Sequence, residues 1–216
     1  MRLHLEVTDH LAERAAEAFA DAIRGALATK ERCSLALSGG HSPGPAFRAL
    51  AQMPIDFARV DLFQVDERVA PRGSSDRNLT LIENDLLTHI AGASPVLYEM
   101  PVDGEPDPDA YARTLPDVLD IVHLGLGPDG HTASLVLNDP VLDVTDRRVA
   151  MCGPYQGYLR MTLTFPALDA ATKTIFLVDG EDKRDALRRL LASDPSIPAG
   201  RLNAEDVLVL TDVSGV

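Results

Sequence analysis

Short apolar runs alternate with longer amphipathic stretches along the chain. The runs predict strands at residues 3–7, 34–37, 60–65, 118–124, 174–178 and 207–210. The stretches between them repeat apolar residues at helical spacing and predict helices at residues 9–28, 43–52, 78–89, 107–115 and 182–192. This alternation predicts an α/β fold, a three-layer, doubly wound, largely parallel sheet with helices on both faces. Ligands of such sheets gather at the carboxyl ends of the strands.

The length and composition favour one domain over residues 1–216. Of the 216 residues, 45% are hydrophobic, enough to bury one sizeable core. The Pro- and Asp-rich run PVDGEPDPD at 101–109 predicts a loop and is too short to mark a domain boundary. The chain opens on a charged amphipathic stretch, and no apolar run approaches the ~18 residues of a membrane span. We therefore expect a cytoplasmic protein without a membrane partner.

The charge balance limits the possible partners. With 20 Lys and Arg against 33 Asp and Glu, the net charge is −13, which argues against nucleic-acid binding. A small anion is still allowed if backbone N–H groups and a few cations form a local positive site. Cys33 and Cys152 stand far apart without a metal-binding motif, so we expect core packing and neither a disulfide nor a metal site.

The segment LSGGHSPG, residues 37–44, has two chemical interpretations. It fits G-x-S-x-G, the nucleophile elbow of serine hydrolases, but the residue after Ser42 is Pro43, which lacks the N–H that the oxyanion hole requires. A phosphate-binding loop is favoured, in which Gly39 and Gly40 let the backbone approach an anion and Ser42 caps a helix with Pro43 in its first turn. A plain strand-to-helix turn and a serine hydrolase acting through Ser42 remain alternatives.

The segment GLGPDGH, residues 125–131, matches the dinucleotide motif G-x-G-x-x-G, with Asp146 about 20 residues further on. The match is weak because Pro128 and Asp129 stand where a pyrophosphate needs N–H donors. Asp129 and His131 favour acid-base chemistry instead. We expect a helix to begin here, so that its N-terminus keeps His131 neutral and ready to accept a proton while Asp129 orients it. A capping histidine is the alternative.

The segment DLFQVDERVAP, residues 61–71, places three charges at the end of an apolar strand. Arg68 at this position is suited to bind an anion or a developing oxyanion. A solvated charged turn is the alternative for Asp66, Glu67 and Arg68. Downstream, we expect Ser75, Arg77 and Asn78 to cap the next helix.

Taken together, SGGHSP, DER followed by SSDRN, and LGLGPDGHTASL resemble the 6-phosphogluconolactonase family, within a superfamily that includes glucosamine-6-phosphate deaminases. The resemblance covers roughly residues 5–190. It implies hydrolysis of 6-phospho-D-glucono-1,5-lactone to 6-phosphogluconate, in the oxidative pentose phosphate pathway, without metal or organic cofactor. The implied catalytic residues are His131 as base, Asp129 and Arg68. The implied substrate-binding residues are Ser38, Gly39, Gly40, His41 and Ser42 in the phosphate loop, with Asp66, Gly130, Arg160 and Lys183.

Two departures from family patterns bear on function. The lactonase family usually has Thr where Ser42 stands, which preserves the hydroxyl. Deaminases resemble a pattern with Glu five residues after the histidine, where this chain has Val136, which cannot titrate. A deaminase is therefore disfavoured. A non-catalytic sugar-phosphate sensor is the other alternative, but the chain opens on a strand and is acidic, so a partner would have to supply the basic DNA-binding helix-turn-helix. We expect a monomer or small homo-oligomer that binds a phosphorylated sugar lactone.

Overall fold

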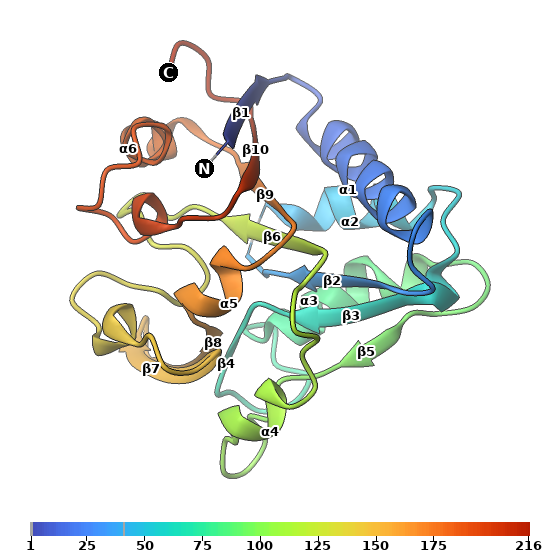
Figure 1. Cartoon of the computed structure of the whole chain (residues 1–216), viewed down its shortest axis with the longest axis horizontal. Helices are drawn as coiled ribbons and strands as arrows, with labels where there is room; N and C mark the ends of the chain where they lie inside the picture. The colour runs from blue at the N-terminus through green and yellow to red at the C-terminus, as the bar shows by residue number, and fades with distance from the viewer. Residues whose placement is uncertain (1, 41) are drawn as a thin grey trace.

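A seven-stranded parallel sheet forms the centre of the computed structural model, which describes residues 2–40 and 42–216 (Figure 1). Its strands lie in the order β1-β10-β9-β6-β2-β3-β5, and every pairing among them is parallel. The bounds are β1 Arg2–Val7, β2 Cys33–Leu37, β3 Val60–Gln64, β5 Val96–Tyr98, β6 Ile121–Gly125, β9 Lys173–Val178 and β10 Asp206–Thr211. The predicted parallel α/β sheet is confirmed.

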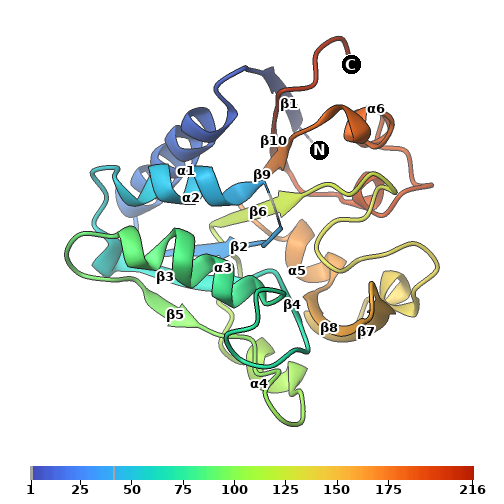
Figure 2. The ribbon, with the colours of Figure 1, turned by 180° about the vertical axis from the view of Figure 1, so that it is seen from behind.

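Helices cover both faces of this sheet, as predicted (Figures 1 and 2). One face carries α1 Leu11–Leu27, α2 Pro43–Ala51 and α3 Asn78–Asp85, and the other carries α4 Pro108–Ala112, α5 Phe165–Asp169 and α6 Arg184–Leu191. Short 3-10 turns are η1 Phe57–Arg59, η2 Leu87–His89, η3 Pro140–Asp143, η4 Glu181–Lys183 and η5 Ala199–Arg201. None of the described helices is long and apolar enough to cross a membrane.

The two faces of the sheet build two separate cores. In β2, Cys33, Leu35 and Leu37 pack towards α1, α2 and α3, whereas Ala36 packs towards the opposite layer. All five residues of this strand are buried, as a strand covered on both sides requires. Cys33 and Cys152 are buried free thiols, so their predicted packing role is confirmed.

A second, antiparallel sheet was not predicted from the sequence. It consists of β4 Asp66–Arg68, β7 Val149–Tyr155 and β8 Tyr158–Leu163, in the order β4-β8-β7. Its apolar side chains, among them Val149 and Leu163, join the same core as α4, α5 and α6. This sheet thus holds the DER segment, residues 66–68, in a strand instead of a turn.

The strand order reverses between β2 and β6. After β2 the chain builds β3 and β5 on one side, then crosses back to place β6 on the other side of β2. The β2–β6 ladder contains only Leu35↔Ile121 and Ala36↔Val122. Beyond these pairs the loops after the two strands separate, which is the arrangement that opens a ligand site in a doubly wound sheet.

Candidate active site

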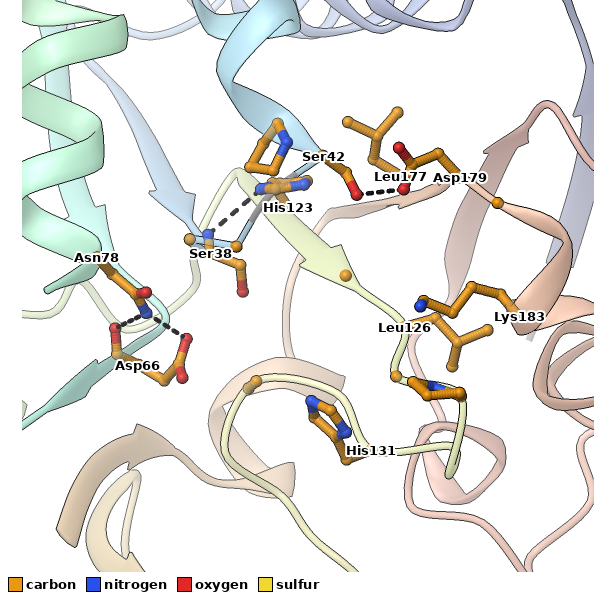
Figure 3. A pocket seen from close by; sticks show the side chains of 18 of the residues that line it. Ser38, Ser42, Asp66, Asn78, His123, Leu126, His131, Leu177, Asp179 and Lys183 are labelled. Carbon is orange, nitrogen blue, oxygen red and sulfur yellow. Dashed lines mark hydrogen bonds between the residues drawn. The ribbon is translucent and has the colours of Figure 1, made fainter. Parts of the chain in front are cut away.

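A cavity of about 520 Å³ lies at the carboxyl ends of β2, β6 and β9 (Figure 3). Residues predicted for the site line it from segments far apart in the sequence: Ser38, Gly39, Gly40, Ser42, Asp66, Arg68, His131, Arg160 and Lys183. His41, also predicted, lies outside the described residues. Asp129 and Gly130, also predicted, precede His131 in the sequence and are not among the lining residues. The structure therefore gathers the predicted motifs at one place.

His131 and Asp129 form a close pair. The Nδ1 of His131 lies 2.5 Å from Asp129 Oδ1, and this oxygen also accepts the backbone N–H of His131 at 3.2 Å. Burial alone would raise the pKa of Asp129, but the hydrogen bonds from His131 outweigh it and hold that pKa below its ordinary value. An ionised Asp129 keeps the ring proton on Nδ1, so Nε2 carries the lone pair that can accept a proton.

The helix predicted to begin near His131 is absent, and that prediction was wrong. Residues 128–139 form turns, and the next helical residues are η3 Pro140–Asp143. Gly130 adopts φ 83° and Ala133 φ 50°, conformations that a helix does not contain. A Cβ on Gly127 would lie 2.0 Å from Nδ1 of His131, so this glycine makes room for the imidazole. The ring therefore has the Asp129 carboxylate expected to orient it, but not the helix N-terminus expected to disfavour its charged form.

The predicted phosphate loop lies beside the first turn of α2. Gly40 adopts φ 111°, which favours glycine, and a Cβ on Gly39 would lie 2.1 Å from Asn78 Oδ1. Ser42 stands at the N-cap position before Pro43, but its hydroxyl does not cap the helix. Its Oγ donates instead to Asp179, after β9 (Figure 3). The capping role predicted for Ser42 was therefore wrong, and the nearby carboxylate is the reason.

The DER segment is not a solvated turn. Asp66 and Glu67 are buried, and Glu67 accepts the backbone N–H groups of Asn78 at 2.8 Å and Leu79 at 2.9 Å. Glu67 thus caps α3 from the neighbouring strand. The prediction that Ser75, Arg77 and Asn78 cap this helix was wrong. The Asn78 amide instead donates to the backbone O of Asp66 at 2.9 Å. Burial raises the pKa of the Asp66 carboxyl.

Three cations supply local positive charge to the cavity of this acidic chain. Arg68, Arg160 and Lys183 all line it, but each already has partners. Arg68 donates to the backbone O of Asp76 at 2.5 Å, and Lys183 pairs with Asp182. Arg160 is buried and lies 4.0 Å from Asp66 Oδ2, and desolvation lowers its pKa. An anionic ligand therefore competes with a carboxylate for Arg160 and Lys183 and with a backbone carbonyl for Arg68.

Sequence reasoning missed several residues of the site, among them Asp179, Tyr155 and His123. Asp179 accepts from Ser42, and Tyr155 contacts Asp129. His123 lines the cavity beneath the phosphate loop, where its Nδ1 accepts the Ser38 N–H at 3.3 Å (Figure 3). Burial lowers the pKa of His123 to about 3. A histidine inside the apolar run IVHLG was the only local signal for it.

Comparison with known proteins agrees with this geometry. The sequence model of a family described as glucosamine-6-phosphate isomerases/6-phosphogluconolactonase matches residues 6–210. A 6-phosphogluconolactonase of Mesorhizobium japonicum is 36% identical over 190 residues, covering 83% of this chain and 80% of the relative. A 6-phosphogluconolactonase of Synechocystis is 32% identical over 197 residues, covering 85% of this chain and 82% of that relative. The crystal structure of 6-phosphogluconolactonase from Thermotoga maritima is 26% identical, with a TM-score of 0.85 and 97% of each chain covered.

Proposed function

The chain belongs to the family of glucosamine-6-phosphate isomerases and 6-phosphogluconolactonases, and we propose that it hydrolyses 6-phospho-D-glucono-1,5-lactone to 6-phosphogluconate with His131 as general base. The observation that carries this assignment of the base is the 2.5 Å contact between His131 and Asp129 at a cavity that also contains Arg68 and Lys183. We further propose that residues 1–216 act as one domain, monomeric or in a small homo-oligomer. We also propose that it acts in the cytoplasm, because a phosphorylated substrate formed there is retained by its charge.

The reaction requires a base, an oxyanion donor and a proton for the leaving oxygen. Nε2 of His131 takes a proton from water, and the resulting hydroxide adds to the lactone carbonyl carbon. Asp129 holds the Nδ1 proton and stabilises the imidazolium that forms. The imidazolium then returns its proton to the ring oxygen as the bond between that oxygen and the carbonyl carbon breaks. Water is consumed, the acid product forms, and His131 is neutral again.

Arg68 is the proposed donor to the oxyanion of the tetrahedral intermediate. The backbone N–H of Gly130, another candidate donor, already donates to Gly127 O at 2.9 Å. Arg68 uses one N–H for the backbone O of Asp76, and its guanidinium has others to offer. Removing one donor from an oxyanion typically costs ~10²- to 10³-fold in turnover.

The phosphate loop and Lys183 are the proposed phosphate site. Backbone N–H groups around Gly39 and Gly40 and the Ser42 hydroxyl border the cavity together with Lys183. Asp182 releases the Lys183 ammonium when the more highly charged phosphate arrives, and Arg160 contacts the sugar. Binding the phosphate far from the carbonyl holds the reacting atoms near His131, so remote binding energy contributes to rate.

The family contains deaminases, and the two activities are separable by assay. Deamination of glucosamine 6-phosphate moves protons between carbon atoms and needs further acid-base groups, whereas Val136 cannot titrate and does not line the cavity. The lactone is generated in situ, and its hydrolysis is followed by acid release at constant pH against a control without enzyme. We expect lactone hydrolysis well above the spontaneous rate and no ammonia from glucosamine 6-phosphate. Ammonia release without lactonase activity would overturn the proposal.

A further inference from the structure

Tyr155 extends from the antiparallel sheet to the Asp129–His131 pair. Its hydroxyl donates to Asp129 Oδ2 at 3.2 Å and lies 3.5 Å from His131 Nδ1. The phenol and imidazole rings meet edge to face, with centroids 5.3 Å apart. Tyr155 therefore contacts both members of the pair, and it does so from a segment that follows them by more than 20 residues in the sequence.

The position of Tyr155 is itself set by contacts with Tyr158 and Arg160. It is the last residue of β7 and pairs with Tyr158 across a tight hairpin. On its other side the Arg160 guanidinium lies 5.1 Å from the centre of the phenol ring, and Arg160 Nε donates to the Tyr155 backbone O at 3.3 Å. Stacking with a buried arginine limits the rotation of the ring. The phenol ring is thus held in one orientation beside Asp129 and His131.

The two oxygens of Asp129 have different tasks. Oδ1 receives both hydrogen bonds from His131, while Oδ2 accepts from Tyr155. The Asp129 side chain is 38% exposed, so without a partner on Oδ2 its carboxylate is free to turn about the Cβ–Cγ bond and to exchange His131 for water. A donor on Oδ2 holds the carboxylate plane and keeps Oδ1 directed at Nδ1.

We infer that Tyr155 is a positioning residue for the general base, acting through Asp129. This inference rests on the proposed function of His131. Burial and the neighbouring Asp129 carboxylate raise the pKa of Tyr155, so the phenol keeps its proton and acts as a donor at neutral pH. Tyr155 is absent from the residues that line the cavity, so its effect falls on the base and leaves substrate binding intact.

The test compares Tyr155→Phe with the control Tyr98→Phe. Phenylalanine at 155 keeps the ring and its stacking with Arg160 and removes only the hydroxyl. Tyr98 stacks on Phe63 away from the cavity, so its replacement removes a phenol hydroxyl from a site without catalytic groups. We expect Tyr155→Phe to lower kcat roughly 5- to 50-fold, with KM within about twofold and the thermal midpoint unchanged. The control should keep wild-type kcat.

Adding Tyr155→Phe to the Asp129→Asn variant distinguishes a role through Asp129 from a purely structural role of Tyr155. If Tyr155 acts through Asp129, adding Tyr155→Phe to Asp129→Asn should lower kcat by less than about twofold further. Wild-type kcat in folded Tyr155→Phe, a change confined to KM, or the same loss in both backgrounds would each overturn the inference. Full activity of His131→Ala would instead refute the proposed base, so the two failures are distinguishable.

Discussion

Replacing His123 with leucine should make the protein more resistant to acid. The imidazole is 1% exposed and makes T-shaped contacts with the rings of Phe19 and Phe47, and burial lowers its pKa from 6.5 to about 3. The unfolded chain, in which this pKa is not lowered, therefore binds a proton at a higher pH than the folded protein does. The free energy of unfolding falls as pH drops from 6.5 towards 3, and this contribution is absent in His123→Leu.

The magnitude follows from the two pKa values. At about pH 5 the folded imidazole is still neutral, while protonation favours the unfolded state by a factor of about 30, which corresponds to about 2 kcal/mol. At about pH 7.5 the same contribution is under about 0.1 kcal/mol. The variant also loses the acceptor of the Ser38 N–H, but this loss is the same at both pH values and cancels in the difference.

Urea unfolding of wild type and His123→Leu at about pH 7.5 and pH 5 measures this difference. We expect the wild type to lose about 2 kcal/mol more than the variant between the two conditions. His89→Gln removes an exposed histidine and is the matched control for loss of one imidazole. Parallel losses in wild type and His123→Leu would refute the conclusion that His123 is buried and neutral.

Three further substitutions test other parts of the site. Ser42→Ala should raise KM several-fold and leave kcat within about threefold, since a phosphate-loop hydroxyl binds substrate and does not react; loss of kcat would favour a nucleophilic serine. Asp129→Asn should lower kcat roughly 10- to 10³-fold with little change in KM, measured by steady-state kinetics, because the amide does not stabilise the imidazolium. Glu67→Ala should cost about 2–4 kcal/mol in urea unfolding, because it removes the cap of α3 and leaves Asp103 as the remaining carboxylate partner of the buried Arg77, whereas exposed Glu13→Ala should cost under about 0.5 kcal/mol.

The central strands of the parallel sheet could be predicted because they are buried on both faces, whereas the short edge strand β5 was not predicted and has no buried residue. Runs such as CSLAL at 33–37 are apolar nearly throughout, and the stripe of Ala15, Phe19 and Ile23 marks the buried side of α1. The antiparallel sheet gave no such signal. β4 contains only the charged residues 66–68, and β7 includes Gly153 and Pro154, so both depend on pairing with β8.

The site could be predicted where its residues are neighbours in the sequence. Asp129 and His131 are two residues apart, and their contact follows from local geometry. Contacts between residues far apart in the sequence could not be predicted, because only the fold brings them together. Ser42 and Asp179, for example, are 137 residues apart. The caps were misassigned for the same reason, because Glu67 reaches the start of α3 from another element.

The turn after His131 shows how local chemistry can mislead. An Asp and a Gly before a histidine resemble a helix start, but Gly130 and Ala133 adopt positive φ and Thr132 pairs with Leu135 in an isolated bridge. These conformations prevent a helix from forming there. The expected effect of a helix N-terminus on His131 therefore has no basis in this structure, and the contact with Asp129 is what remains of that expectation.

The most direct test of the account is the turnover of phosphorylated lactone by His131→Ala beside the wild type, with spontaneous hydrolysis subtracted. We expect kcat to fall roughly 10²- to 10⁴-fold while the variant keeps the wild-type thermal midpoint. Near-wild-type turnover by folded His131→Ala would contradict the assignment of His131 as the general base.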